Sequence, residues 1–136
     1  AASDVYKRQD VCKWQQADVF EYLRQAREAG DTYDLIILDP PKFASSHYHV
    51  DRAARAYKDI NLNGLRLLRA GGQLLTFSCS GAIDTDLFQK IVAGAVIDAR
   101  RQAWALTRFG AGVDHPLLMT FPEGEYLKGL HLKLCD

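Results

Sequence analysis

Apolar residues recur along the chain at spacings that predict helices alternating with short strands. Asp18 and Glu21 have the spacing of a helix capping box, and Gly30 is a typical stop for the helix that follows. Residues 33–38 (YDLIIL) form a near-continuous apolar run, as a buried parallel strand requires, and the two prolines after Asp39 end it. The first part of the chain therefore predicts one helix and one strand.

The alternation continues in the middle of the chain. A long helix is expected over residues 52–69, closed by the Gly71-Gly72 pair, and a second strand over residues 73–77 (QLLTF). The acidic and hydroxyl residues at 84–86 predict a further helix start, and the arginines at 100–101 suit the negative end of that helix.

Two further strands are expected over residues 102–109 and 126–134. In the last segment apolar and polar residues alternate, and the polar ones are Lys128, His131 and Lys133. The apolar ones are Leu127, Leu130, Leu132 and Leu134. Strands that alternate with helices indicate an α/β domain with a mainly parallel sheet.

Ligands in such sheets bind at the carboxyl ends of the strands, which here are followed by residues 39–43 (DPPKF) and 78–81 (SCSG). Consecutive prolines make a stiff turn that would aim the Asp39 carboxylate outward, and Phe43 could stack on a planar base. The alternative is an ordinary Asp-Pro strand exit. Cys79, a few residues before a helix start, could be a nucleophilic thiolate, or a small buried hydrophobe.

Composition narrows the function classes. The 136 residues suffice for one domain with a real core, and the longest aliphatic run, residues 35–38, excludes a membrane-spanning helix. Three scattered cysteines argue against disulfides or zinc and favour a reducing, cytoplasmic compartment. The pair His47 and His49 lacks further ligands, so no metal is expected. Seventeen basic and 17 acidic residues cancel, which removes any overall basic field that would attract nucleic acid.

Six short motifs occur in a specific order: DPPKF (39–43), YKDIN (57–61), LLTFSCSG (74–81), LFQKI (87–91), DHP (114–116) and FPEGEYLKGL (121–130). In this order, over residues 18–134, the chain resembles the bacterial 23S ribosomal RNA cytosine-5 methyltransferases, a branch of the class I S-adenosylmethionine-dependent enzymes. The resemblance implies a Rossmann-like sheet, mainly parallel with an antiparallel C-terminal strand, S-adenosylmethionine as cofactor and 23S ribosomal RNA as partner.

The resemblance also implies a sheet truncated at its N-terminus. The glycine-rich loop and the acidic residue that begin a class I cofactor site are absent, so residues 11–136 would be the C-terminal part of a methyltransferase domain. Residues 1–10 show no apolar period and are expected to be a leader, either a frayed native terminus or a non-native segment. The fragment alone is expected to be inactive and of marginal stability.

Individual roles follow from the matching motifs. Cys79 would be the nucleophile, and Asp39 a catalytic residue that also contacts the cofactor. The cofactor would further contact Asp18, Val19, Phe20 and Pro40, and the target base Pro41, Lys42, Phe43, Ser78 and Ser80. Asp18 has the alternative role of helix N-cap, and the choice between Asp39 and Lys42 as acid/base stays open. Related enzymes with two cysteines carry the second in the motif that here reads DPPKF, which favours the one-cysteine branch.

Other functions remain open on the sequence. The chain could methylate a different base position, such as uracil carbon 5 or an amino group, or could be a non-catalytic remnant. His115 with Cys79 would suggest a cysteine hydrolase, but no orienting third residue stands out. The basic residues of the long helix are either a solvated face, which is favoured, or a phosphate-contacting patch; they are Arg52, Arg55, Lys58, Arg66 and Arg69.

Overall fold

A mixed four-stranded sheet forms the centre of the computed structural model, which describes residues 11–43 and 46–136. The strands are β1 (Tyr33–Leu38), β2 (Leu68–Ser78), β3 (Ala103–Phe109) and β4 (Lys128–Leu134), in the spatial order β1-β2-β4-β3. β1 and β2 are parallel, whereas β4 runs antiparallel to both of its neighbours. The predicted α/β sheet with an antiparallel C-terminal strand is confirmed. The predicted leader, residues 1–10, lies outside the described residues.

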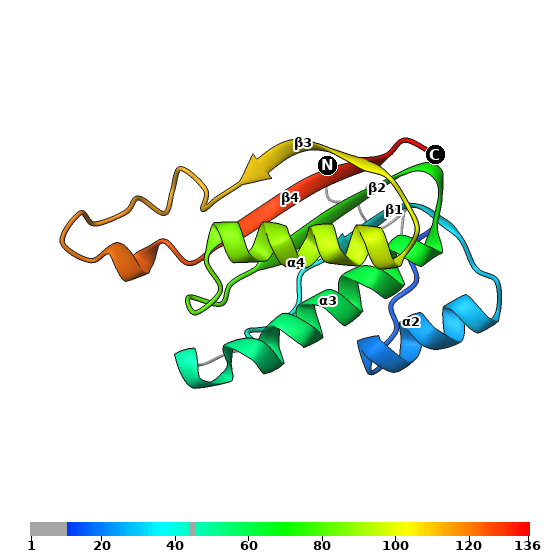
Figure 1. The fold of residues 1–136 in the computed structure, drawn as a ribbon, viewed down its shortest axis with the longest axis horizontal. Coiled ribbons are helices and arrows are strands. Elements are labelled where there is room, and N and C mark those ends of the chain that lie inside the picture. Colours follow the sequence, from blue (N-terminus) through cyan, green and yellow to red (C-terminus); the bar gives the residue numbers. More distant parts are fainter. Residues whose placement is uncertain (1–10, 44–45) are drawn as a thin grey trace.

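In the part of the chain that the structure describes, three α-helices lie along one side of this sheet (Figure 1). They are α2 (Val19–Glu28), α3 (Val50–Leu67) and α4 (Thr85–Asp98), and α3 lies between the other two. Short 3-10 turns occur at His47–His49 and Pro122–Gly124. In Figure 1 the connection between β3 and β4 extends away from the sheet. Within the described residues, no helix is long and apolar enough to cross a membrane.

The end of α3 differs from the prediction. The Gly71-Gly72 pair does not close the helix, since α3 ends at Leu67 and both glycines lie within β2. Leu68 turns into extended backbone (ψ 138°), and the Arg101 guanidinium donates to the carbonyls of Leu65 and Leu68 at 3.0 and 2.9 Å. The helix end is therefore satisfied by a side chain from another part of the chain, which local sequence patterns do not reveal.

The face assigned to Lys128 also differs from the prediction. Residues of equal parity share one face of a strand, so Lys128 belongs with Leu130, Leu132 and Leu134 rather than with Lys133. Lys128 is buried, as these three leucines are, while Lys133 is exposed. The polar character of lysine had suggested the solvent face, but the ammonium finds buried partners, described below.

Aromatic side chains connect the helices to the segment that follows β1. Phe43 packs against Phe20 at the start of α2 (ring centroids 5.9 Å apart) and edge-on against Tyr57 of α3 (4.7 Å). Tyr57 in turn meets Phe88 of α4 at 5.9 Å, and both of these rings are fully buried. The residues after β1 are thus fixed by a continuous row of rings, which we call the aromatic row: Phe20, Phe43, Tyr57 and Phe88.

Candidate active site

The two predicted strand-end motifs lie at the same edge of the sheet. Leu38, the last residue of β1, pairs with Thr76 of the parallel strand β2. Asp39 and Cys79 therefore follow their strands on the same side of the molecule, as expected for a parallel pair. This edge is the candidate active site.

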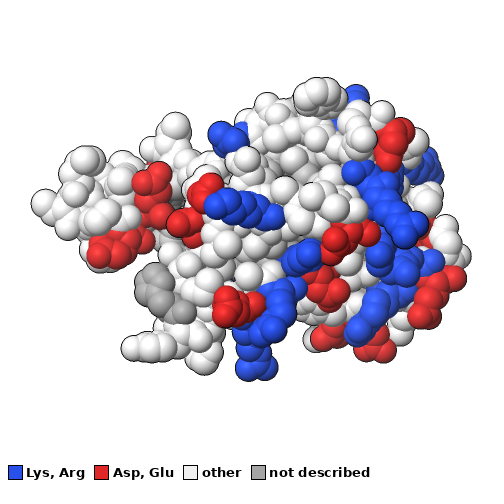
Figure 2. All heavy atoms as spheres, in the orientation of Figure 1, with Lys and Arg blue, Asp and Glu red and all other residues white. Residues whose placement is uncertain are grey.

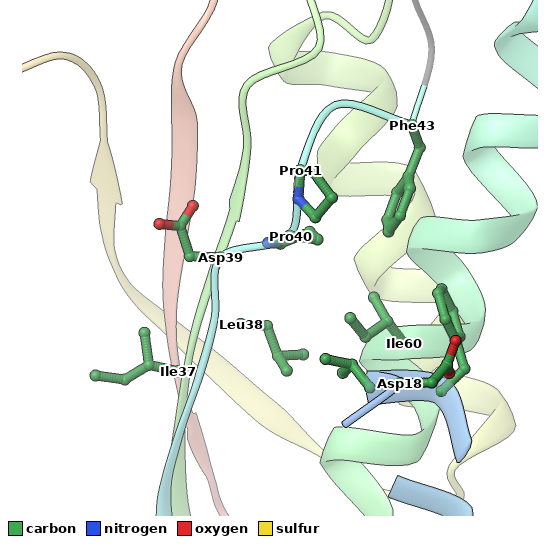
Figure 3. Close-up of a pocket in the computed structure, with 10 residues that line it drawn as sticks. Asp18, Ile37, Leu38, Asp39, Pro40, Pro41, Phe43 and Ile60 are labelled. Atoms are coloured by element: carbon green, nitrogen blue, oxygen red, sulfur yellow. The ribbon is translucent and has the colours of Figure 1, made fainter. Parts of the chain in front are cut away.

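A hollow of about 460 Å³ lies beside the end of β1 (Figure 3). It is lined by the five residues predicted to contact a cofactor, namely Asp18, Val19, Phe20, Asp39 and Pro40, together with Ile37, Leu38, Pro41, Phe43 and Ile60. Its volume is within the usual range for a small-molecule site, and its walls are mostly apolar. Among these lining residues, only Asp18 and Asp39 carry a carboxylate.

The two aspartates differ in how they are held. Asp18 caps α2, with Oδ1 accepting from the Glu21 backbone N–H at 3.0 Å, so the cap and a pocket-lining position coexist in one residue. Asp39 is exposed. In Figure 3 its carboxylate and the Ile37 side chain lie on one side of β1, and Leu38 lies on the other side, toward Asp18. The hollow thus presents an apolar interior with carboxylates at its margins.

Cys79 lies in the turn that links β2 to α4 and is half-buried. Its neighbours Ser78 and Ser80 are fully buried, and the Ser80 N–H donates to Ser78 Oγ at 3.3 Å. The Ile83 N–H donates to the Ser80 carbonyl at 3.1 Å, which closes the turn. Burial gives both serines a structural position, and their contact with a substrate stays a prediction.

The substrate residues predicted from DPPKF are divided between two hollows. Pro41 and Phe43 line the first, whereas Lys42 lines a second hollow with Gly81, Ala82 and Glu125. That second hollow joins the segment after β1, the turn after Cys79 and the connection before β4. Lys42 therefore shares a hollow with the residues that follow Cys79 and is not among those that line the first hollow.

Sequence reasoning missed Lys128. Its Nζ donates to the Ser80 carbonyl at 2.7 Å and to the Ile83 carbonyl, both in the turn after Cys79. Burial lowers the pKa of Lys128, while negative charge on Cys79 and Asp84 acts in the opposite direction. The parity of the residue with the leucines of β4 is the one signal that could have placed it inside.

Other candidate groups do not gather at this edge. In the part of the chain that the structure describes, no three His, Cys, Asp or Glu side chains form a metal cluster. His115 is exposed in the extended connection, and its Nδ1 lies 3.1 Å from Asp114 Oδ1. Cys79 is not among the described contacts of His115, so the geometry does not favour a hydrolase dyad.

Two of the five basic residues considered as a phosphate patch are paired with acidic groups. Lys58 Nζ lies 2.8 Å from Asp98 Oδ2, and Arg69, which follows the helix, pairs with Asp34 at 3.0 Å. Figure 2 shows basic and acidic side chains intermixed over this face, with acidic groups on the extended connection. The solvated-face interpretation therefore fits these residues better than a phosphate patch.

Comparisons with known proteins point to one enzyme class. No protein-family model matches the chain. The chain is 53% identical over 121 residues to the Ribosomal RNA large subunit methyltransferase I of Shewanella frigidimarina, and 54% identical over 113 residues to the protein of that name from Photobacterium profundum. These matches cover 89% and 83% of this chain, but 30% and 28% of the relatives. The chain thus spans about 30% of their length.

Solved structures agree on the fold. A methyltransferase solved in complex with SAH superposes with a TM-score of 0.71 and 24% identity, covering 86% of this chain and 30% of that one. A SAM-dependent methyltransferase from Streptococcus mutans gives the same TM-score. The chain has the fold of the corresponding part of these methyltransferases, which confirms the fold that the resemblance implied.

Proposed function

We propose that this chain is the C-terminal part of an S-adenosylmethionine-dependent methyltransferase that acts on carbon 5 of a cytosine in 23S ribosomal RNA. The observation that carries the proposal is the position of Cys79, which is half-buried just past the end of β2. The apolar hollow lies beside the matching end of the parallel strand β1, and Cys79 is not among the residues that line it. The relatives' name supports ribosomal RNA of the large subunit as substrate. In a bacterium such a substrate would place the enzyme in the cytoplasm.

The first hollow fits part of the proposed cofactor. Phe20, Val19 and Ile60 supply apolar surface for a flat ring system, and Asp18 retains a second carboxylate oxygen beyond the one used in the helix cap. Asp39 at the margin would face the charged end of the ligand. S-adenosylmethionine, when bound, supplies an electrophilic methyl group on a sulfonium centre. The rest of its site would come from the part of the relatives that this chain does not cover.

Carbon 5 of cytosine is a poor nucleophile, which gives Cys79 its proposed role. The thiolate Sγ adds to carbon 6, and the electron pair of the 5,6 double bond makes carbon 5 enamine-like, able to take a methyl group. A base then removes the carbon 5 proton, the double bond reforms, and the carbon 6–sulfur bond breaks to return the thiolate. Asp39 and Lys42 are the two candidates for the base.

The experiment uses a chimera, because the relatives are about three times longer than this chain. Residues 18–136 replace the matching segment of the Shewanella frigidimarina relative, and large-subunit RNA from a strain lacking the enzyme is the substrate. We expect one 5-methylcytosine by mass spectrometry. Cys79→Ala should reduce its formation by at least about 10³-fold while S-adenosylmethionine binding persists. Cys135→Ala, which changes another cysteine that is exposed, is the matched control.

Two outcomes would contradict the proposal. Substantial methylation by the Cys79→Ala chimera would exclude the covalent mechanism, and methylation of uracil or of an amino group would exclude the cytosine-5 assignment. RNA that carries 5-fluorocytidine provides an independent readout. Fluorine at carbon 5 prevents the final elimination, so the parent chimera should remain covalently attached to this RNA and the Cys79→Ala chimera should not.

A further inference from the structure

Lys128 is a buried lysine at the end of the central antiparallel strand pair. It pairs directly with Ser78 across the β2–β4 ladder, and only 6% of its surface is exposed. Lysine is rarely buried to this extent, because removing an ammonium from water is costly unless hydrogen-bond acceptors replace the solvent. The position of its partners therefore indicates what the side chain stabilises.

Both partners belong to the turn that follows Cys79. The Lys128 ammonium donates to the Ser80 carbonyl at 2.7 Å and to the Ile83 carbonyl. The same Ser80 carbonyl accepts the Ile83 N–H at 3.1 Å, so the ammonium joins both ends of a turn that is already closed. Because Cys79 immediately precedes this turn, the backbone on its C-terminal side is tied to β4 through one side chain.

We propose that Lys128 is a positioning residue for Cys79, which holds the turn after the thiol and stabilises the thiolate by its positive charge. This inference rests on the proposed function, in which the thiolate is the nucleophile. An ammonium carries three protons, and carbonyl oxygens of the described residues accept two of them.

The charged surroundings support an electrostatic role. Negative charge on Cys79 and on Asp84 raises the pKa of Lys128 against the larger lowering effect of burial. The ammonium is held against the turn that directly follows the thiol, and a cation beside a thiol is the arrangement that stabilises thiolates in proteins. Asp84, Glu125 and Lys128 are the charged residues that line a hollow of about 270 Å³ beside this turn.

The test measures thiol reactivity in the 136-residue chain, independently of methylation. Cys12→Ser and Cys135→Ser leave Cys79 as the single thiol, and its rate of alkylation by iodoacetamide is followed against pH. Lys128→Gln keeps N–H donors for the carbonyls but removes the charge. We expect its pH midpoint to rise and its alkylation near neutral pH to slow by about tenfold. Lys128→Arg should restore most of this loss, and Lys133→Gln, an exposed lysine on the same strand, should leave it unchanged.

An unchanged pH midpoint in a folded Lys128→Gln variant would overturn the proposal, because a purely structural lysine affects stability and not the titration. Folding of each variant is checked by circular dichroism. Should the Gln variant not fold, the parent is compared with itself in denaturing urea. The native midpoint must then be the lower one, and an equal or higher midpoint rejects the role. Failure of the proposed function is separate, since it appears as absent cytosine methylation in the chimera whatever the thiol reactivity.

Discussion

Gly129 occupies a position where an added methyl group should cost stability. It follows Lys128 in β4 and pairs with Phe77 of β2 on one side and with Phe109 of β3 on the other. The two phenyl rings stack across it, with centroids 5.7 Å apart and planes at 24°. A Cβ at this position would lie 2.5 Å from Phe77 Cε1 and 3.2 Å from Phe109 Cβ, so at least one ring must move.

The expected cost can be worked from the two ways in which the site could respond. If the rings stay, the added methyl overpacks the site at a cost of about 1–3 kcal/mol. If Phe77, which is only partly buried, rotates away, the ring pair is lost at about 0.5–1.5 kcal/mol. Alanine recovers about 0.5–1 kcal/mol, since glycine loses more conformational freedom in a strand. Gly129→Ala should therefore lower the free energy of unfolding by about 1 kcal/mol, and the Tm by roughly 4 °C for a chain of this size.

Thermal unfolding of the 136-residue chain, followed by circular dichroism, measures this shift. Gly110→Ala is the matched control, because a Cβ there meets no atom within 4 Å. The double variant Phe77→Leu, Gly129→Ala should lose less than the sum of its single changes, since the smaller side chain removes the clash. A Gly129→Ala chain as stable as the parent would refute the reasoning. It would mean that the rings, and the register that sets Lys128 opposite Ser78, are less constrained than the distances indicate.

Two further predictions concern contacts away from the candidate active site. Arg101→Met should lower the free energy of unfolding by about 3 kcal/mol, because it leaves the carbonyls at the end of α3 and the Asp136 carboxylate without their charged donor. Urea unfolding measures the change, and Arg24→Met, which alters an exposed arginine, is the control. The hydroxyl contact with Tyr22 raises the pKa of Tyr33 to about 12, so Tyr22→Phe should move the titration of Tyr33 back toward its usual range of about 10. Phenolate absorbance against pH measures it, and an unchanged titration would show that the contact is not the cause.

Local patterns predicted the elements where local forces decide them. The helix start at Asp18 and the bounds of the strand Tyr33–Leu38 follow from a cap and an apolar run, and both are as expected. The predicted burial of this strand was wrong, because β1 is an edge strand of the described sheet and Leu35 and Ile37 are 50% and 59% exposed. The predicted end of α3 was wrong because the carbonyls at the true end accept from Arg101, which lies more than 30 residues further along the chain. Helix propensity and a glycine pair carry no information about such a partner.

The candidate active site also contains features that local patterns predicted and features that they did not. The common edge of Asp39 and Cys79 was predictable, because any two parallel strands place their carboxyl ends together. The burial of Lys128 was not, because its cost is offset only by two carbonyls from a turn that lies 45 and 48 residues earlier in the chain. The alternation along β4 predicted that Lys128 faces the core, whereas the polarity of lysine predicted that it faces the solvent. Choosing between them requires knowing which acceptors face the strand, and these are known only from the tertiary structure.

The two halves of the candidate site are held by different kinds of force, which makes them separable by experiment. The wall of the first hollow depends on the aromatic row, in which Phe43 is fixed by dispersion and burial against Phe20 and Tyr57. The Cys79 turn depends on the Lys128 ammonium, whose contacts are hydrogen bonds to backbone carbonyls. A change in Phe43 should therefore weaken ligand binding in the hollow without shifting the pH profile of Cys79, whereas a change in Lys128 should do the reverse. The two halves meet at α4, where Phe88 belongs to the aromatic row and the cap at Asp84 follows the turn, so α4 is the element through which a disturbance of one half would reach the other.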